Sequence, residues 1–208
     1  MYFNPSTGKP QNNPWFNADA THPFNVGYDY NHESQDTKDF VDRVLKFWVE
    51  EYRIDGYRFD LSKGFTQKNS GSDVGGWSAY DQSRINIWKR IRDEFRKSCS
   101  DCYMILEHLG DNSEEKVLAD EGFIMWGKMT EQFNEATMGY AGSKQNLSWG
   151  NYKSRSFSYP NLVTYAESHD EERLMFKNKT YGNTNGSYSV KNTNTALQRM
   201  EAAMAMLL

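Results

Sequence analysis

Three acidic residues stand at or just beyond the ends of short apolar segments that are typical of β-strands. Asp60 closes one segment, in "GYRFDL", Glu107 closes "YMILE", and Asp170 lies just beyond another, in "YAESHDEER". Because the carboxyl ends of parallel strands converge in a barrel, we expect the three carboxyl groups to face one another. Repulsion raises the pKa of the least solvated group, so one acid stays protonated while another stays ionised. Hydrolysis of a glycosidic bond requires such a pair.

The strand that carries Asp60 has one aromatic side and one charged side. Side chains alternate along a strand, so Tyr57 and Phe59 point one way while Arg58 and Asp60 point the other. Two charges taken out of water are costly unless they are paired, so this arrangement favours a functional site. A lone acid at a strand end is commonly a helix cap or a solvated residue. Three such acids, together with Arg58 and His169, favour a shared site.

Strands and helices are expected to alternate along the chain. The predicted strands cover residues 56–61, 103–107, 123–126 and 161–168. The predicted helices cover residues 34–52, 81–98, about 113–121 and 195–208, with one or two more expected within 127–160. Polar loops are expected over 62–80 and 178–194. This alternation predicts an α/β fold with a parallel sheet, and no Gly-rich phosphate-binding motif follows any of the strands.

The apolar residues of two predicted helices define the faces that we expect to be buried. In the helix over 34–52 these residues are Phe40, Val41, Val44, Leu45, Trp48 and Tyr52. In the helix over 81–98 they are Ile85, Trp88, Ile91 and Phe95. Their spacing of three and four residues is typical of an amphipathic helix.

Three segments give the chain a resemblance to a known family. "GYRFDLSKG", "ILEHLG" and "YAESHDEER" resemble, in order, the second, third and fourth signature regions of the α-amylase family, glycoside hydrolase family 13. The resemblance implies part of a (β/α)8 TIM barrel, from about its fourth to its seventh strand with their helices. Residues 1–33 are then an irregular segment, the end of an inserted domain or loop. On the same resemblance, residues 34–208 are expected to form a partial (β/α) barrel catalytic domain.

The resemblance assigns the catalytic roles residue by residue. It implies that Asp60 is the nucleophile, that Glu107 is the general acid/base, and that Asp170 binds sugar hydroxyls and stabilises the transition state. The implied reaction is retaining cleavage of α-glucosidic bonds in starch-like glucans.

Substrate contacts are implied for Arg58, His169 and Lys63. Arg58 would orient the nucleophile, and His169 would hydrogen-bond the sugar beside the cleaved bond. One departure from the family pattern is Gly64, where many amylases have His, and it removes an expected contact on the leaving-group side.

Several alternatives use the same residues. A transglycosylase or an α-1,6-glucosidase of the same family would need the same three acids. A non-catalytic carbohydrate-binding protein or an inactive fragment is the alternative from another class. Since the family barrel has eight strands and this chain resembles only four, we expect a fragment of a longer enzyme. Extracellular or periplasmic location is expected by resemblance, although the chain contains no signal peptide.

Bulk composition excludes other classes of function. The net charge is −4 and there is no block of basic residues, so a nucleic-acid partner is not expected. No apolar run is long enough for a membrane span.

No metal ligand is assigned in this chain, although the resemblance allows calcium in the full-length enzyme. Cys99 and Cys102 are incidental or locally bridged cysteines, a metal site or a redox pair, and zinc would need ligands that the sequence lacks. The segment "DYNH", Asp29 to His32, is interpreted as the loop that enters the first long helix.

Overall fold

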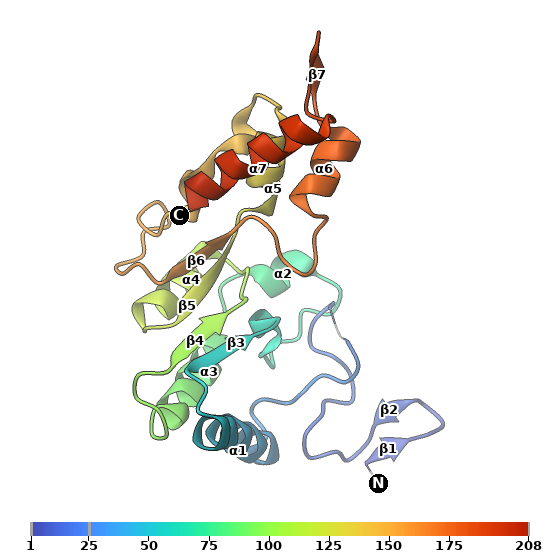
Figure 1. The fold of residues 1–208 in the computed structure, drawn as a ribbon. Helices are drawn as coiled ribbons and strands as arrows, with labels where there is room; N and C mark the ends of the chain where they lie inside the picture. The colour runs from blue at the N-terminus through green and yellow to red at the C-terminus, as the bar shows by residue number, and fades with distance from the viewer. Residues whose placement is uncertain (1, 25, 208) are drawn as a thin grey trace. The chain divides into compact units, whose positions relative to one another are not determined.

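The computed structural model describes residues 2–24 and 26–207 (Figure 1). The chain divides into two compact units, Met1–Met125 and Trp126–Leu208. The division falls inside one strand, β5 (Ile124–Lys128). In the part of the chain that the structure describes, none of the helices combines the length and the apolar character that a membrane span needs.

Four strands form the central sheet in the order β3-β4-β5-β6, which is also their order along the chain. Besides β5 they are β3 (Gly56–Phe59), β4 (Tyr103–Leu106) and β6 (Leu162–Tyr165). The pairs β3–β4 and β4–β5 are parallel. Helices lie between consecutive strands in the sequence. The predicted α/β class is therefore confirmed.

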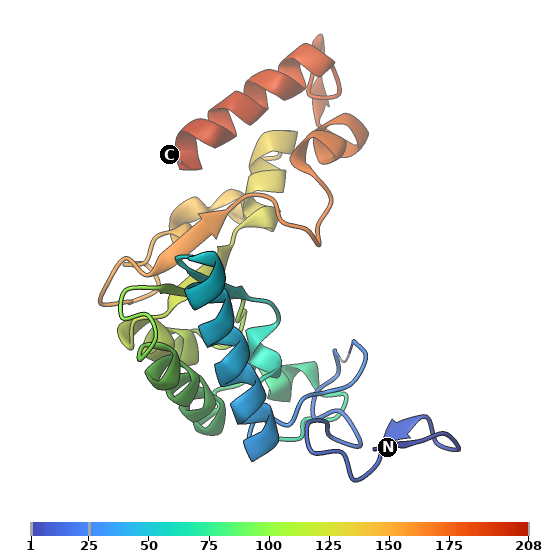
Figure 2. The ribbon, with the colours of Figure 1, turned by 60° about the horizontal axis from the view of Figure 1, so that its bottom comes forward.

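The first unit packs its long helices against the aromatic side of β3. Its helices are α1 (Gln35–Tyr52), α2 (Val74–Ser78), α3 (Gln82–Phe95) and α4 (Asn112–Asp120). Helices α1 and α3 lie side by side (Figure 2). The Tyr57 hydroxyl donates a 2.7 Å hydrogen bond to the Leu45 carbonyl of α1, and its ring lies 5.4 Å from that of Phe95 of α3. These contacts anchor β3 to both helices.

Helix α3 supplies the centre of this core, as its sequence pattern predicts. All four residues of its predicted apolar face are buried: Ile85, Trp88, Ile91 and Phe95. The ring of Trp88 lies 4.9 Å from that of Phe59 and 4.4 Å from that of Phe65. Trp88 thus joins the helix to the strand and to the turn that follows the strand.

The predicted apolar face of α1 is only partly buried. Leu45 is buried, whereas Phe40, Trp48 and Tyr52 are 37%, 44% and 59% exposed. Helical spacing identifies residues that share a face, but it does not state what covers that face.

The structure corrects several boundaries, of which three lie next to the site or in expected loops. Strand β3 ends at Phe59, because Leu61 adopts a left-handed conformation with φ of 46° that a strand cannot contain. The expected loop over 62–80 contains α2, whose first turn is capped by the Asp73 carboxylate. Helix α6 (Leu174–Tyr181) extends into the expected loop over 178–194.

The N-terminal segment is largely irregular, as predicted, but it contains short pairings. Strands β1 (Phe3–Asn4) and β2 (Lys9–Pro10) form a small antiparallel hairpin. Phe16 and Tyr30 form an isolated bridge. The "DYNH" segment precedes α1, which confirms its interpretation as the loop that enters this helix.

The two cysteines are bonded to each other. The Cys99–Cys102 disulfide lies between α3 and β4. It confirms the local-bridge alternative, and neither sulfur is left as a free thiol to hold a metal.

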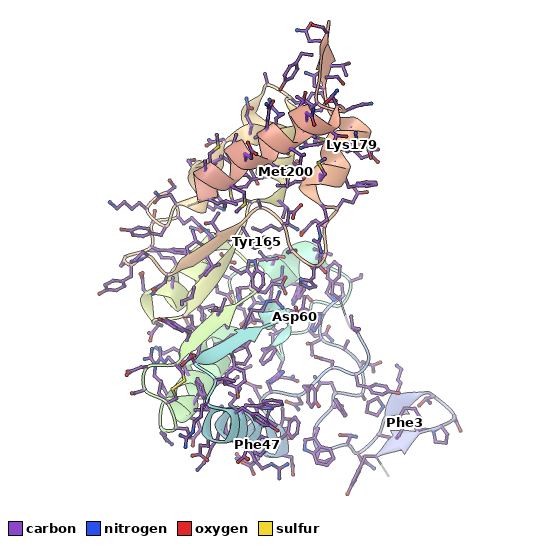
Figure 3. All side chains as sticks on the ribbon, in the orientation of Figure 1. Phe3, Phe47, Asp60, Tyr165, Lys179 and Met200 are labelled. Carbon is purple, nitrogen blue, oxygen red and sulfur yellow. A yellow bond between two sulfur atoms is a disulfide. The ribbon has the colours of Figure 1, made fainter. Side chains whose placement is uncertain are left out.

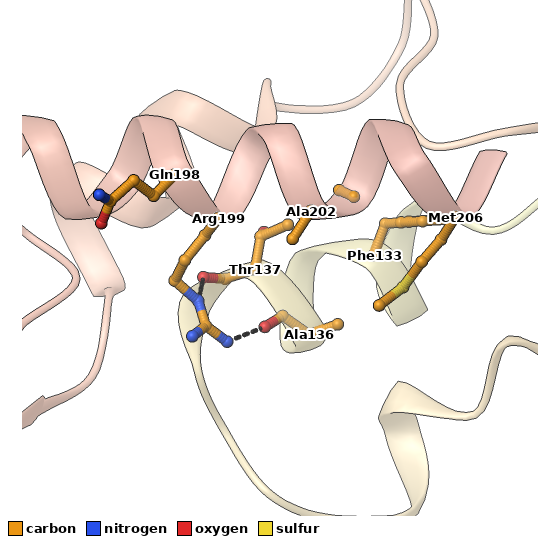
Figure 4. A pocket seen from close by; sticks show the side chains of 8 residues that line it. Phe133, Ala136, Thr137, Gln198, Arg199, Ala202 and Met206 are labelled. Carbon is orange, nitrogen blue, oxygen red and sulfur yellow. Dashed lines mark hydrogen bonds between the residues drawn. The ribbon is translucent and has the colours of Figure 1, made fainter. Parts of the chain in front are cut away.

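The second unit has its own core, made largely by helices. Besides α6 it contains α5 (Thr130–Met138), α7 (Thr193–Leu207) and a hairpin of β7 (Thr184–Asn185) and β8 (Tyr188–Ser189). Met129, Phe133 and Leu174 are buried together in this core. Figure 4 shows Arg199 of α7 donating to the carbonyls of Ala136 and Thr137 of α5, beside a pocket of about 290 Å³.

We expect Gly56→Ala to destabilise the first unit by about 1–3 kcal/mol. A Cβ atom at this position would lie 2.3 Å from the Tyr103 carbonyl oxygen and 2.7 Å from its nitrogen, so the β3–β4 pairing must separate to admit it. Urea unfolding monitored by tryptophan fluorescence measures the loss. Gly142→Ala is the control, because a Cβ atom there meets nothing within 4 Å. Equal stability of the two variants would contradict the prediction.

Candidate active site

Asp60 and Glu107 leave the sheet next to each other. Phe59 of β3 is paired with Leu106 of β4, so the residues that follow them are neighbours. The Glu107 N–H donates to the Phe59 carbonyl at 3.0 Å. A carboxylate oxygen of Asp60 and one of Glu107 lie within 4.8 Å of each other. Figure 3 labels Asp60 at the end of β3.

One guanidinium group contacts both carboxylates. Arg58 lies on the same side of β3 as Asp60, and its Nη1 atom donates to Asp60 Oδ1. Its Nη2 atom lies 2.9 Å from Glu107 Oε2. The charged and aromatic sides expected for this strand are therefore both present, and Arg58 offsets the repulsion between the two acids.

The two acids have unlike environments. The side chain of Glu107 is 8% exposed, whereas that of Asp60 is 65% exposed. Burial raises the pKa of Glu107 above its ordinary value, and the neighbouring Asp60 acts in the same direction. A 3.1 Å hydrogen bond from the Leu61 N–H and the charge of Arg58 oppose the rise. The surroundings of Glu107 thus favour its protonated form more than those of an exposed carboxyl group would, whereas Asp60 lies largely in solvent.

A pocket of about 360 Å³ lies beside Asp60. Its ring-bearing lining residues are His22, Phe24, Tyr28, Tyr30, His32 and Phe65. All but Phe65 come from the segment before α1. Sequence reasoning assigned no function to this segment, although its density of aromatic residues was a signal that it could line a binding surface.

His22 occupies space above the turn that follows Asp60. A Cβ atom on Gly64 would lie 2.9 Å from His22 Nε2. The imidazole stacks on Trp77, with ring centres 5.0 Å apart, and its Nε2 atom lies 3.6 Å from Asp29 Oδ1. A ring from the N-terminal segment therefore packs against position 64, where the family pattern often has a histidine side chain.

The structure places Lys63 beneath the turn, where its ammonium group is engaged by the protein. Its Nζ atom donates to Ser78 Oγ at 3.0 Å and to the Leu109 carbonyl at 2.9 Å. It also lies 4.1 Å from the centre of the Trp77 ring. Burial lowers the pKa of Lys63, and the nearby Arg84 adds to this effect. A contact between Lys63 and substrate stays a prediction.

His169 and Asp170 belong to the second unit, in the loop between β6 and α6. His169 Nε2 lies 3.3 Å from Asp170 Oδ1, and both side chains are more than half exposed. Ser168 donates to Glu171 at 2.5 Å, and Glu171 pairs with Lys128 of β5, so the loop is tied to its own unit. The roles expected for Asp170 and His169 stay predictions.

Asp29 is a buried carboxylate of the N-terminal segment that donors of the protein satisfy. Its Oδ2 atom accepts hydrogen bonds from Asn17 Nδ2 at 2.9 Å and from the Thr21 N–H at 3.0 Å. Calcium binds through a cage of six to eight oxygen atoms, whereas these partners are N–H donors. Asp29 is thus held as an internal acceptor, and calcium stays an expectation for the full-length enzyme.

The fold and these contacts define a class of site. A buried carboxyl group whose pKa is raised and an exposed carboxyl group, at adjacent strand ends, are of the kind that glycoside hydrolases use. Residues 15–206 match the model of the alpha-amylase family, described as the alpha amylase catalytic domain. The chain belongs to this family, whose members are broadly glycoside hydrolases. Comparison with curated proteins finds no match.

We expect His32 to make the unfolding free energy pH-dependent between about pH 5 and 6.5. Burial lowers the pKa of His32 from 6.5 to about 4, so in this window the unfolded chain binds more protons and stability falls as the pH falls. The whole shift corresponds to about 3 kcal/mol between the two pKa values and their flanks, and roughly half of this falls between pH 5 and 6.5. Urea titrations at several pH values measure it.

His32→Phe is the matched variant, since a ring can still stack on Phe65, which lies 3.7 Å from the imidazole centre. The variant should lose the slope between pH 5 and 6.5. The carboxyl groups whose pKa values are lowered, such as those of Asp29 and Glu114, change the unfolding free energy at pH values below this window. An unchanged slope in His32→Phe would contradict the assignment.

Proposed function

We propose that this chain supplies the catalytic residues of a retaining glycoside hydrolase that cleaves α-glucosidic bonds of starch-like glucans. Asp60 is the nucleophile and Glu107 is the general acid/base. Asp170 is the third acid, which binds sugar hydroxyls. Arg58 and His169 bind around the reacting sugar.

The observation that carries the proposal is the pairing of a buried Glu107 with an exposed Asp60 at close range. Inverting enzymes separate their carboxyl groups by roughly 6.5–9.5 Å to admit a water molecule, whereas retaining enzymes hold them closer. Oxygen atoms within 4.8 Å favour the retaining arrangement. The raised pKa of Glu107 supports its role as the proton donor.

In the first step, Glu107 gives its proton to the glycosidic oxygen, and the leaving sugar departs as an alcohol. Asp60 attacks the anomeric carbon and forms a covalent glycosyl ester. In the second step, the Glu107 carboxylate takes a proton from water, whose oxygen attacks the same carbon. The Asp60 carboxylate is released, and both acids return to their starting states.

The pocket beside Asp60 is the proposed site for a glucosyl unit. Its aromatic rings suit the apolar faces of a sugar, while Asp60 and the histidines offer polar contacts. The four central strands are proposed to be the fourth to seventh strands of a (β/α)8 barrel. A location outside the cytosol is also proposed, and the Cys99–Cys102 disulfide supports it because disulfides persist in oxidising compartments.

We expect Asp60→Asn and Glu107→Gln each to lower kcat at least ~100-fold, because each removes a group that forms or breaks a bond. Reducing-sugar release from soluble starch by the full-length protein measures the loss. Asp55→Asn is the control, since this exposed acid precedes the same strand at its opposite end. Activity indifferent to both catalytic-site changes would refute the assignment. Glucan binding by calorimetry without any sugar release would favour the non-catalytic alternative.

Product analysis tests the mechanism and the substrate. Proton NMR during hydrolysis should show the α-anomer as the first product, whereas an initial β-anomer would indicate inversion. Comparing products from soluble starch, isomaltose and sucrose distinguishes starch hydrolysis from α-1,6-cleavage and from transfer to another sugar.

A further inference from the structure

A fully buried network of charged residues lies beneath the turn that follows Asp60. Arg84 of α3 and Glu114 of α4 are 1% and 0% exposed. Arg84 Nε donates to Glu114 Oε1 at 2.6 Å, and Arg84 Nη2 donates to Glu114 Oε2 at 2.7 Å. Glu114 Oε1 also lies 2.7 Å from His108 Nε2, and His108 Nδ1 lies 3.0 Å from Ser62 Oγ. The network runs from two helices to His108, which follows Glu107 directly, and to Ser62, which is two residues after Asp60.

A buried ion pair contributes little net stability to the packing of two helices. Desolvation of two charges commonly offsets their attraction, and apolar residues of similar volume often serve stability as well. Burial opposes ionisation of Glu114, but hydrogen bonds from His108 and Arg84 keep its pKa below the ordinary value. Arg84 and Glu114 thus form a charged pair inside the first unit, which calls for a use beyond helix packing.

The turn that the network supports is strained. Leu61 lies in the left-handed region, with φ of 46° and ψ of 40°, which is unfavourable for a residue with a side chain. In this conformation its N–H donates to Glu107 Oε2 at 3.1 Å. The left-handed conformation of Leu61 therefore points its N–H group toward the buried Glu107 carboxyl group.

Three side chains hold the carbonyl groups that follow Leu61. Arg84 Nη1 donates to the Lys63 carbonyl at 3.2 Å, and Trp77 Nε1 donates to the same oxygen at 3.1 Å. Trp88 Nε1 donates to the Ser62 carbonyl at 3.1 Å. A strained backbone conformation persists only where many surrounding contacts hold it in place. Arg84 connects the turn to the buried ion pair, because it donates both to the Lys63 carbonyl and to Glu114.

We propose that Arg84, Glu114 and His108 are positioning residues for the reaction. They hold the turn after Asp60 and the segment after Glu107 in one arrangement, so that the Leu61 N–H stays on the Glu107 carboxyl group while Asp60 stays beside it. None of the three needs to touch substrate. This inference rests on the proposed function of Asp60 and Glu107.

The test replaces the ion pair without leaving a lone buried charge. In the full-length protein, Arg84→Met combined with Glu114→Gln removes both charges and keeps one carbonyl acceptor. Because misplacing catalytic groups by about 1 Å can cost about 100-fold, we expect kcat to fall by about that factor while KM changes little. Circular dichroism checks that the variant is folded, because Arg84 also donates to the Trp77 and Ala79 carbonyls and its loss lowers the melting temperature. The substrate is whichever of soluble starch, isomaltose and sucrose the parent cleaves.

A second, more exposed ion pair between the same two parts of the unit is the control. Arg92 of α3 pairs with Glu121, just after α4, with 2.7 Å between Nη1 and Oε2. The side-chain hydrogen bonds that hold the turn after Asp60, described above, do not involve Arg92 or Glu121. Arg92→Met combined with Glu121→Gln should keep the kcat of the parent. An equal loss of kcat in both double variants would overturn the proposal. The loss would then follow from removing any ion pair between these two parts of the unit, and not from the contact of Arg84 with the turn.

Ser62→Ala decides the matter if the Arg84/Glu114 double variant does not fold. It deletes only the hydroxyl that contacts His108 and leaves the ion pair intact. We expect kcat to fall roughly 5- to 10-fold at unchanged KM, as the loss of one hydrogen bond would give, in a variant that circular dichroism shows to be folded. A kcat equal to that of the parent in Ser62→Ala, or in a folded double variant, would overturn the positioning role alone. A parent inactive on all three substrates would overturn the proposed function and this inference with it.

Discussion

The parallel register of β3 and β4 is the constraint on which the arrangement of the acids depends. Phe59 stands opposite Leu106, so the next residue of each strand emerges at the same level. A slip by one residue would turn the side chains of one strand to the other face of the sheet. Arg58 could then no longer reach Asp60 and Glu107 at once. The contacts of β3 with α1 and α3 and with the aromatic core hold the strand in its register with β4.

The parts of the site that follow from local rules could be predicted from the sequence. Alternation along a strand was enough to separate Tyr57 and Phe59 from Arg58 and Asp60, because the period of two is a property of the backbone. The buried face of α3 followed in the same way from helical spacing, and Trp88 at its centre is fully buried. In both cases the pattern belongs to one element, so no knowledge of distant residues was needed.

The parts that depend on distant contacts could not be predicted. The rings of His22 and Trp77 stack although a long stretch of chain separates them, so no local pattern places His22 in the pocket beside Asp60. Glu114 lies in a polar helix and looks solvated, yet it is fully buried because Arg84 and His108 converge on it. Phe40 shows the opposite error, since a regular apolar spacing did not bring burial. Burial is set by what packs against a residue, and this information is not local.

The contact between His22 and Gly64 makes two distant positions of the sequence interdependent. A Cβ atom at position 64 would lie 2.9 Å from His22 Nε2, so a side chain there requires the imidazole to leave its stacked position on Trp77. The effect of a substitution at one position therefore depends on the residue at the other, which is structural epistasis. A histidine introduced at position 64, to match the common family pattern, would be accommodated only together with a small residue at position 22. The loop before α1 and the turn after β3 must therefore be changed together, in redesign as in evolution.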